Sequence, residues 1–177
     1  VTKSSAIFDY DKLNWLNQHY IKNKNLSDIA DMVLPYLSDL NIKVSDRKYL
    51  ENILSLGIDR DYNLKNIASG LTYYFEDDLN YKSDDFMKLD PVKSKTVIEN
   101  VIKKISNIEF DNKENISNCI KEVCSDMSLK FKDVGPAVRF SLTARLKAPS
   151  IDELCFTLGK DKALKRLNDF YTFLSLA

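Results

Sequence analysis

Residues that form turns are scarce in this sequence, which contains only four Gly and four Pro among 177 residues. Sandwiches and barrels of β-strands need many tight turns, and Gly and Pro are the residues that mark turns most strongly. Apolar residues recur instead at intervals of three and four, the spacing of one helix face, for example Val97, Val101 and Ile105. The sequence therefore predicts an all-α fold.

Candidate helix-capping residues support this prediction at several places along the chain. Asp9 and Asp46 each precede an apolar stripe, where an Asp side chain can accept a hydrogen bond from the first helical turn. Asp90-Pro91 supplies an N-cap with proline at the first helical position. Gly135-Pro136 is expected to start a further helix.

The first expected helix carries Leu13, Leu16 and Tyr20 on one face, and Trp15 lies in the same segment. An apolar stripe at this spacing is typical of a helix that packs against a core. We therefore expect Trp15 and Tyr20 to be buried rather than to serve as stacking surfaces for a ligand.

An acidic, tyrosine-rich stretch at residues 73–90 shows no clear helical period and separates two helical halves. The sequence shows no internal repeat across this boundary. We therefore expect two consecutive helical bundles, residues 1–80 and residues 81–177.

The composition is that of an ordinary globular protein, with 44% hydrophobic and 29% charged residues. Its apolar runs are too short for a membrane span or a signal peptide, so no membrane partner is expected. Because the chain starts at Val1 without an initiator Met, we expect it to be part of a longer protein. Three cysteines without C-x-x-C spacing predict buried free thiols in a reducing cytoplasm.

Candidates for catalysis are missing from the sequence. His19 is the single histidine, and one histidine does not by itself build a nucleophilic system. No metal-binding cluster of Cys and His and no Gly-rich phosphate loop is present. The acidic clusters Glu76-Asp77-Asp78 and Asp84-Asp85 could bind a cation, but solvated surface charge or helix capping explains them better. We expect no catalytic residue, metal site or cofactor in this chain.

Charge is balanced overall, at a formal net charge of zero, but it is unevenly placed. Residues 59–90 carry eight acids against four bases, a net charge of −4. Residues 130–147 carry five bases against one acid, a net charge of +4. A basic stretch in a neutral protein suits a small phosphate-contacting surface, although solvated helix charge would explain it about as well.

Two segments far apart in the sequence are distinctive when taken together. They are Phe8-Asp-Tyr-Asp-Lys-Leu-Asn-Trp-Leu-Asn17 and Pro136-Ala-Val-Arg-Phe-Ser-Leu-Thr-Ala-Arg-Leu-Lys-Ala-Pro-Ser150. In this order they closely resemble the C-terminal half of bacterial glutamyl-tRNA synthetases. Leu158-Gly-Lys160 and Leu164-Lys-Arg-Leu167 extend the resemblance, which runs from about Ser5 to about Phe170.

The resemblance implies that the chain is the tRNA anticodon-binding segment of a glutamate–tRNA ligase. In that family, ATP-driven aminoacylation depends on motifs similar to His-Ile-Gly-His and Lys-Met-Ser-Lys-Ser, and neither motif occurs here. The catalytic domain, with its ATP and Mg²⁺, is therefore expected outside this chain but in the same polypeptide. The expected partner is glutamate tRNA, and the expected protein is a cytoplasmic monomer.

Arg60 falls on the position where the family carries an arginine that reads the third anticodon base. Glutamate and glutamine anticodons differ there, C against G. Cytosine offers acceptors on its pairing edge and guanine offers N–H donors, whereas arginine carries donors only. The chemistry suits an arginine that selects C, although a surface ion pair with Asp59 or Asp61 is the alternative.

In the second half, the family pattern places the contacts to the other two anticodon bases on a helix and on the loop after it. By this resemblance the contacts fall on Arg139, Ala148 and Ile151. Ala148 replaces the Thr that some members carry, so a side-chain hydrogen bond is lost and a backbone contact could substitute. Phosphate contacts are then expected from basic residues of the same stretch, namely Lys130, Lys132, Arg145 and Lys147.

A second function remains open from the sequence alone. A helical adaptor could bind a protein partner through an apolar groove and have no role with RNA. Such an adaptor would need an apolar stripe that is left over once the core is filled.

Overall fold

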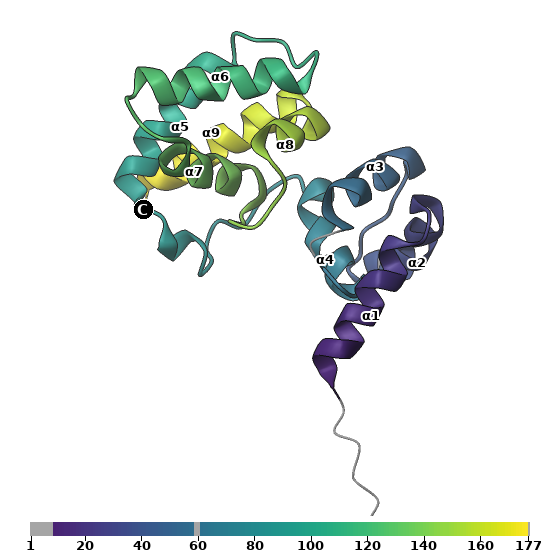
Figure 1. Ribbon diagram of the computed structural model, residues 1–177. Helices are drawn as coiled ribbons and strands as arrows, with labels where there is room; N and C mark the ends of the chain where they lie inside the picture. Colours follow the sequence, from purple (N-terminus) through teal and green to yellow (C-terminus); the bar gives the residue numbers. More distant parts are fainter. Residues whose placement is uncertain (1–8, 59–60, 177) are drawn as a thin grey trace, which may run out of the picture. The chain divides into compact units, whose positions relative to one another are not determined.

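The computed structural model describes residues 9–58 and 61–176, so Arg60 lies outside the described residues. Within these two ranges the chain forms nine α-helices and no β-strand. The prediction of an all-α fold is confirmed. The chain divides into two compact units, unit 1 at Val1–Phe75 and unit 2 at Glu76–Ala177 (Figure 1).

Unit 1 contains α1 (Tyr10–Lys22), α2 (Leu26–Asp39), α3 (Arg47–Gly57) and α4 (Leu64–Phe75). Helix α2 packs against both α3 and α4, and these two helices also contact each other. The small core between them is aliphatic and is formed by fully buried side chains such as Ile29, Val33, Leu37, Leu50 and Ile53.

The predicted N-caps are formed in both units. The Asp9 carboxylate accepts a hydrogen bond from the Lys12 amide at 3.1 Å, and the Asp46 carboxylate accepts one from the Tyr49 amide at 3.0 Å. Asp90 caps α5 in the same way. Each carboxylate satisfies an amide that has no partner within its helix, so these three predictions are confirmed.

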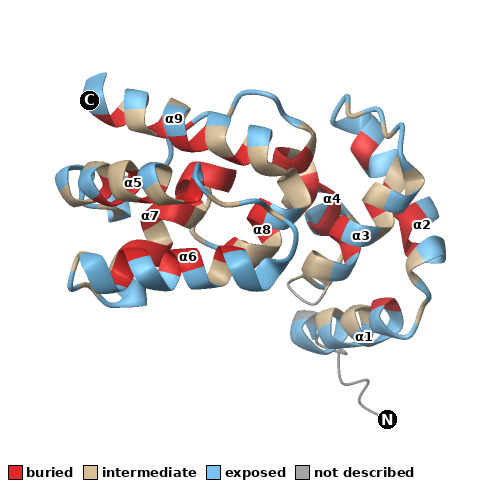
Figure 2. Ribbon diagram, turned by 90° about the horizontal axis from the view of Figure 1, so that it is seen from above, coloured by how far each residue is buried: buried red, intermediate tan, exposed pale blue. Residues whose placement is uncertain are grey.

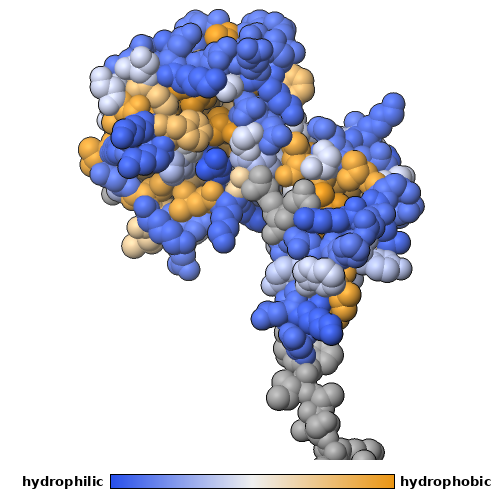
Figure 3. All heavy atoms as spheres, viewed as in Figure 1, coloured by the Kyte–Doolittle hydropathy of each residue, from blue (hydrophilic) through white to orange (hydrophobic). Residues whose placement is uncertain are grey.

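The expected burial of the α1 stripe is wrong. Trp15 is 62% exposed and Tyr20 is 69% exposed, and Leu13 and Leu16 on the same helix are exposed as well. Ile21 is the one buried side chain among those described in α1 (Figure 2). Figure 3 shows hydrophobic atoms along this helix between hydrophilic ones. The helical period identified the apolar face correctly but contained no information on what would cover it.

Unit 2 contains the short 3-10 helix η2 (Phe86–Lys88) and five α-helices. They are α5 (Pro91–Ile105), α6 (Lys113–Asp126), α7 (Phe131–Thr143), α8 (Ile151–Leu158) and α9 (Lys160–Leu176). Helix α7 contacts all four of the other α-helices, and most of its residues are buried (Figure 2).

Helix α7 begins at Phe131, so the expected start at Gly135-Pro136 is wrong. The Asp133 carboxylate accepts a hydrogen bond from the Lys130 amide at 3.3 Å, which closes the first turn earlier than expected. Gly135 then lies inside the helix under the Phe131 ring. A Cβ at this position would lie 2.8 Å from Cε1 of Phe131, so a larger residue would displace the ring.

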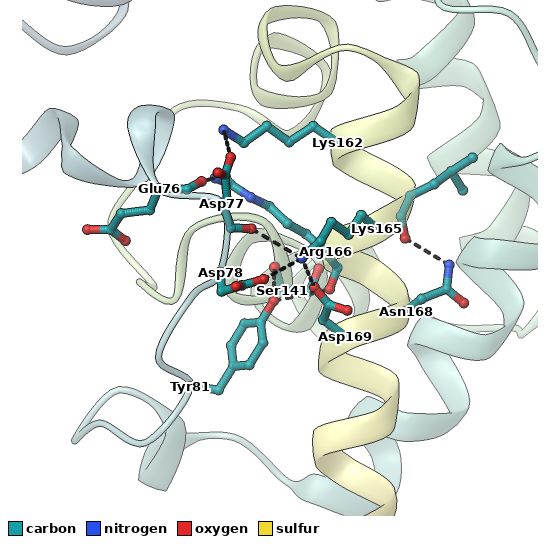
Figure 4. Close-up of polar contacts among 11 residues, drawn as sticks. Glu76, Asp77, Asp78, Tyr81, Ser141, Lys162, Lys165, Arg166, Asn168 and Asp169 are labelled. Carbon is teal, nitrogen blue, oxygen red and sulfur yellow. Dashed lines mark hydrogen bonds and ion pairs between the residues drawn. The ribbon is translucent and has the colours of Figure 1, made fainter. Parts of the chain in front are cut away.

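The buried Arg166 of α9 supports the C-terminal end of α7. Its side chain is 1% exposed, and it donates hydrogen bonds to the carbonyls of Leu142 at 2.6 Å and Glu76 at 2.9 Å. The Tyr81 hydroxyl donates toward the Ser141 carbonyl at 2.9 Å (Figure 4). The residues after α4 are thereby fixed to the last turn of α7.

The three cysteines, Cys119, Cys124 and Cys155, are buried and free, as predicted. Burial raises the pKa of each thiol, because the charged thiolate is poorly solvated there. The described part of the chain contains no cluster of His, Cys, Asp and Glu that could hold a metal ion. In the same residues, no helix is both long and apolar enough to cross a bilayer.

Candidate nucleic-acid interface

The candidate interface lies at the C-terminal end of α7 and in the α7–α8 loop, residues 144–150. Helix α7 ends at Thr143, and Ala144 adopts a left-handed conformation with φ of 54°. The Thr143 hydroxyl lies 2.9 Å from the Arg139 carbonyl and 3.0 Å from the Arg145 carbonyl. It also accepts a hydrogen bond from the Arg145 amide at 3.1 Å. One buried hydroxyl thus fixes the path by which the chain leaves the helix.

Arg139 connects α7 to the far end of the same loop. Its Nε donates a hydrogen bond to the Pro149 carbonyl at 3.2 Å, and the side chain is half-buried. A guanidinium has five N–H donors in a rigid plane, and this bond ties one of them to the end of the loop. Arg139 therefore orients the loop and retains a planar cationic group beside it.

Asp85, just before η2, holds the middle of the loop. Its Oδ2 accepts a hydrogen bond from the Leu146 amide at 3.0 Å, and its Oδ1 pairs with Lys88 Nζ at 2.7 Å. The ion pair with Lys88 and the bond from Leu146 lower the pKa of Asp85 below its ordinary value. The carboxylate is consequently charged at neutral pH, and its bond to the loop is charge-assisted.

The loop and the helices on either side of it bring together five of the residues singled out from the sequence. Lys147 is exposed and Arg145 is half-buried. Ala148 is 7% exposed and Ile151 is 3% exposed, so their side chains pack inward. The loop therefore offers backbone groups and basic side chains, while its apolar side chains fix it to the unit.

Lys130 and Lys132 lie at the opposite end of α7 from Arg145 and Lys147. The 13 residues of α7 span about 20 Å at about 1.5 Å per residue. Asp133, which pairs with Lys93 at 2.7 Å, adds a negative charge at that end. The four basic residues grouped by sequence therefore form two separate pairs, and only one pair adjoins the α7–α8 loop.

In unit 1, the segment between α3 and α4 carries the remaining predicted residue, Arg60, outside the described residues. One of its two candidate ion-pair partners is described. The Asp61 carboxylate accepts a hydrogen bond from Asn66 Nδ2 at 3.1 Å on α4. Asp61 therefore already contacts α4.

Sequence reasoning missed Asp85 and Arg166 as supports of this interface. Asp85 stood out only as half of the acidic pair Asp84-Asp85, and its loop partner lies 61 residues further along the chain. Arg166 falls in the distinctive segment Leu164-Lys-Arg-Leu167, but nothing in that pattern predicts contacts with the end of α7. Among these signals, only the unusual position of an arginine on an apolar helix face could have indicated a buried role.

Comparison with known proteins gives consistent matches along the chain. The family model described as anticodon binding domain matches residues 28–171. A glutamate–tRNA ligase of Buchnera aphidicola is 29% identical over 174 residues, 98% of this chain and 37% of the relative. One from Methylobacillus flagellatus is 32% identical over 167 residues, 94% of this chain and 35% of the relative.

A solved structure shows a similar fold. The crystal structure of a glutamate tRNA ligase from Elizabethkingia meningosepticum in complex with its amino acid matches with a TM-score of 0.81. The sequence identity is 24%, and the match covers 98% of this chain and 34% of that one. The chain thus spans little more than a third of the length of the proteins it resembles.

Proposed function

The chain belongs to the anticodon binding domain family, and on that premise we propose that it binds the anticodon loop of glutamate tRNA for a glutamate–tRNA ligase. The observation that carries this proposal is the α7–α8 loop, which is fixed at both ends and in the middle. Thr143, Asp85 and Arg139 hold it through hydrogen bonds of 3.0–3.2 Å. Arg145 and Lys147 are carried on this fixed loop.

A fixed loop of this kind suits the recognition of unpaired RNA bases. Proteins read RNA sequence mainly in single-stranded loops, where the base edges are accessible. Hydrogen bonds distinguish one base from another only if the donors and acceptors are held in place, whereas phosphate contacts need mainly positive charge. We assign Arg139 and the backbone beside Ala148 and Ile151 to the two anticodon bases other than the third. Arg145 and Lys147 are assigned to phosphates.

Residues 1–80 are assigned to the tRNA stem and to the third anticodon base, which Arg60 would read. An arginine opposite cytosine places donors against acceptors, and opposite guanine it places donors against donors. Arg60→Gln should therefore reduce discrimination between C and G more than it reduces affinity. A Lys147→Ala variant provides the matched control, because it should lower affinity for both tRNAs alike.

The test is a binding titration against glutamate tRNA and the same tRNA with C changed to G at the third anticodon base. It is run at moderate salt, since phosphate contacts are weaker there. The wild-type chain should prefer C, and Arg60→Gln should lose about tenfold of that preference, the effect of one mismatched hydrogen-bond pair. Absence of any tRNA binding would contradict the proposed function.

The chemistry of the ligase is assigned to a part of the polypeptide outside this chain. ATP and Mg²⁺ would bind in that part, whose activity is glutamate activation and transfer to tRNA. The exposed apolar residues of α1, Leu13, Trp15, Leu16 and Tyr20, support a contact with that part. Exposed apolar surface of this kind is typical of a face that another segment covers.

Trp15 can report this contact directly, because it is the only tryptophan in the chain. It can be labelled with 5-fluorotryptophan and assigned with a Trp15→Phe variant. Its fluorine resonance should respond to replacing H₂O by D₂O in this chain alone and lose that response in the longer polypeptide. An equal response in both would contradict the contact.

We further propose that the complete ligase is a cytoplasmic monomer. Three buried free cysteines fit a reducing compartment. Sedimentation of the ligase across a range of concentrations checks the monomer, and a concentration-dependent mass would contradict it. The match to the anticodon binding domain model favours RNA binding over the adaptor function that the sequence left open.

A further inference from the structure

Asp85 makes a contact that is unexpected for an acid beside an RNA-binding loop. A carboxylate near phosphates is unfavourable, yet Asp85 lies against the basic α7–α8 loop and bonds to the Leu146 amide at 3.0 Å. Its side chain is 30% exposed, so it is partly enclosed by the surrounding residues. The repulsion between Asp85 and phosphates must therefore be offset by a favourable contribution of Asp85 to the loop.

The position of the bonded amide indicates that role. Leu146 lies between Arg145 and Lys147, so fixing its amide sets the direction of the backbone that carries both basic side chains. Thr143 holds the start of the loop and Arg139 holds its end. Asp85 supplies the anchor between them, and it comes from a segment some sixty residues earlier in the chain.

Lys88 completes the arrangement from the same side as Asp85. Its Nζ pairs with Oδ1 at 2.7 Å and leaves Oδ2 directed at the loop amide. The pair keeps the carboxylate oriented, and it offsets the negative charge close to where phosphates would bind. Lys88 is itself exposed, so its positive charge reaches solvent.

We propose that Asp85 is a positioning residue for base recognition by the α7–α8 loop. The proposal rests on the proposed function, since it assigns Asp85 to the loop that would read the two anticodon bases other than the third. Asp85 acts through the Leu146 amide and does not itself touch RNA. Its contribution is therefore to base discrimination at those positions, not to overall affinity.

The experiment uses three variants of the complete chain. Asp85→Ala removes the acceptor and the charge, whereas Asp85→Asn removes the charge and keeps a side-chain oxygen that can accept from Leu146. Asp84→Ala removes the same charge from the neighbouring exposed position. Each variant is titrated with glutamate tRNA and with three versions that carry one changed anticodon base each.

Asp85→Ala should lose about tenfold of its discrimination at one or both of the bases other than the third, the effect of one lost charge-assisted hydrogen bond. Discrimination at the third base should persist, which shows that the variant is folded. Asp85→Asn should keep most of the discrimination, and Asp84→Ala should match the wild type.

Three outcomes would overturn the inference. Asp85→Ala could bind all four tRNAs more tightly with its discrimination unchanged, which would make Asp85 only a repulsive charge. It could retain wild-type discrimination and affinity. Asp85→Asn could lose as much discrimination as Asp85→Ala, which would assign the effect to charge instead of the loop bond. A wild-type chain that discriminates no base would instead contradict the proposed function, so the two failures are distinguishable.

Discussion

The two ends of helix α7 carry two basic residues each, but the structure supports them differently. At the C-terminal end, Arg145 and Lys147 lie in a loop whose backbone is bonded to Thr143, Asp85 and Arg139. At the N-terminal end, Lys130 is the N-cap and Lys132 lies in the first helical turn, and both side chains are exposed. The two pairs therefore carry equal charge on different supports, a loop held by three side chains and the start of a helix.

This difference separates two requirements of RNA recognition. Attraction to phosphates depends on charge and is screened by salt. Base discrimination depends on donors and acceptors held to within a fraction of an ångström, since a misplaced hydrogen bond loses most of its strength. The C-terminal end of α7 combines charge with the half-buried Arg139 guanidinium that is bonded to the loop, whereas the exposed lysine side chains of the N-terminal end supply charge.

The largest effect is expected from removing Arg166, which supports the C-terminal end through Leu142. Arg166→Met should lower the free energy of unfolding of unit 2 by about 3 kcal/mol, because the buried Leu142 carbonyl and the part-buried Glu76 carbonyl lose their charged donors. Urea denaturation followed by circular dichroism measures the change. Lys132→Met, at an exposed position of the same unit, is the control and should leave the transition almost unchanged. Equal midpoints for both variants would contradict this support.

The next effect is expected at Thr143, whose hydroxyl closes the end of α7. Thr143→Val keeps the shape of the side chain and leaves the Arg145 amide without this acceptor, at an expected cost of about 1–3 kcal/mol. The variant should also lose base discrimination. Thr143→Ser retains the hydroxyl and should behave much more like the wild type. Thermal unfolding and tRNA titration together check the prediction, and a Ser variant as impaired as the Val variant would refute it.

A smaller effect should distinguish the two basic pairs directly. Lys147→Ala should flatten the salt dependence of tRNA binding by about one phosphate contact, a slope change near 0.7–0.9. Lys132→Ala removes the same charge at the other end of α7 and should leave the slope nearly unchanged. Binding constants over a salt series give both slopes. If the two slopes fall equally, the distinction between the ends of α7 is lost.

The smallest effect concerns the left-handed residue that begins the loop. Ala144 has φ of 54°, a conformation that glycine adopts without strain. Ala144→Gly should stabilise the chain by about 0.5 kcal/mol, because relief of this strain exceeds the added freedom of the unfolded chain. The thermal midpoint measures it, with a substitution of the right-handed Ala137 by Gly as the destabilising control. A lower midpoint for Ala144→Gly would contradict the assigned strain.

Local signals in the sequence predicted much of the fold. Asp9, Asp46 and Asp90 were found as caps because each bonds to an amide three residues away. The position of the first helix was correct as well, but the burial of Trp15 was not. A helical period identifies an apolar face, and only packing decides whether something covers it.

Less of the candidate interface could be predicted from the sequence. The net charge over residues 130–147 was taken as one basic stretch, although α7 separates two of its bases from two others. The reason is that α7 was expected to start at Gly135-Pro136 instead of Phe131. With the helix bounded correctly, its rise alone would have separated the two pairs. The bond between Asp85 and Leu146 joins residues 61 positions apart, and no local pattern predicts such a contact.

The most direct test of this account follows the backbone amide resonances of the 20.4 kDa chain while the anticodon stem–loop of glutamate tRNA is added. We predict that the amide resonances of residues 144–150 and of Arg139 shift, while those of residues 130–132 stay almost unchanged. Shifts concentrated at residues 130–132, or shifts of equal size at both ends of α7, would contradict it.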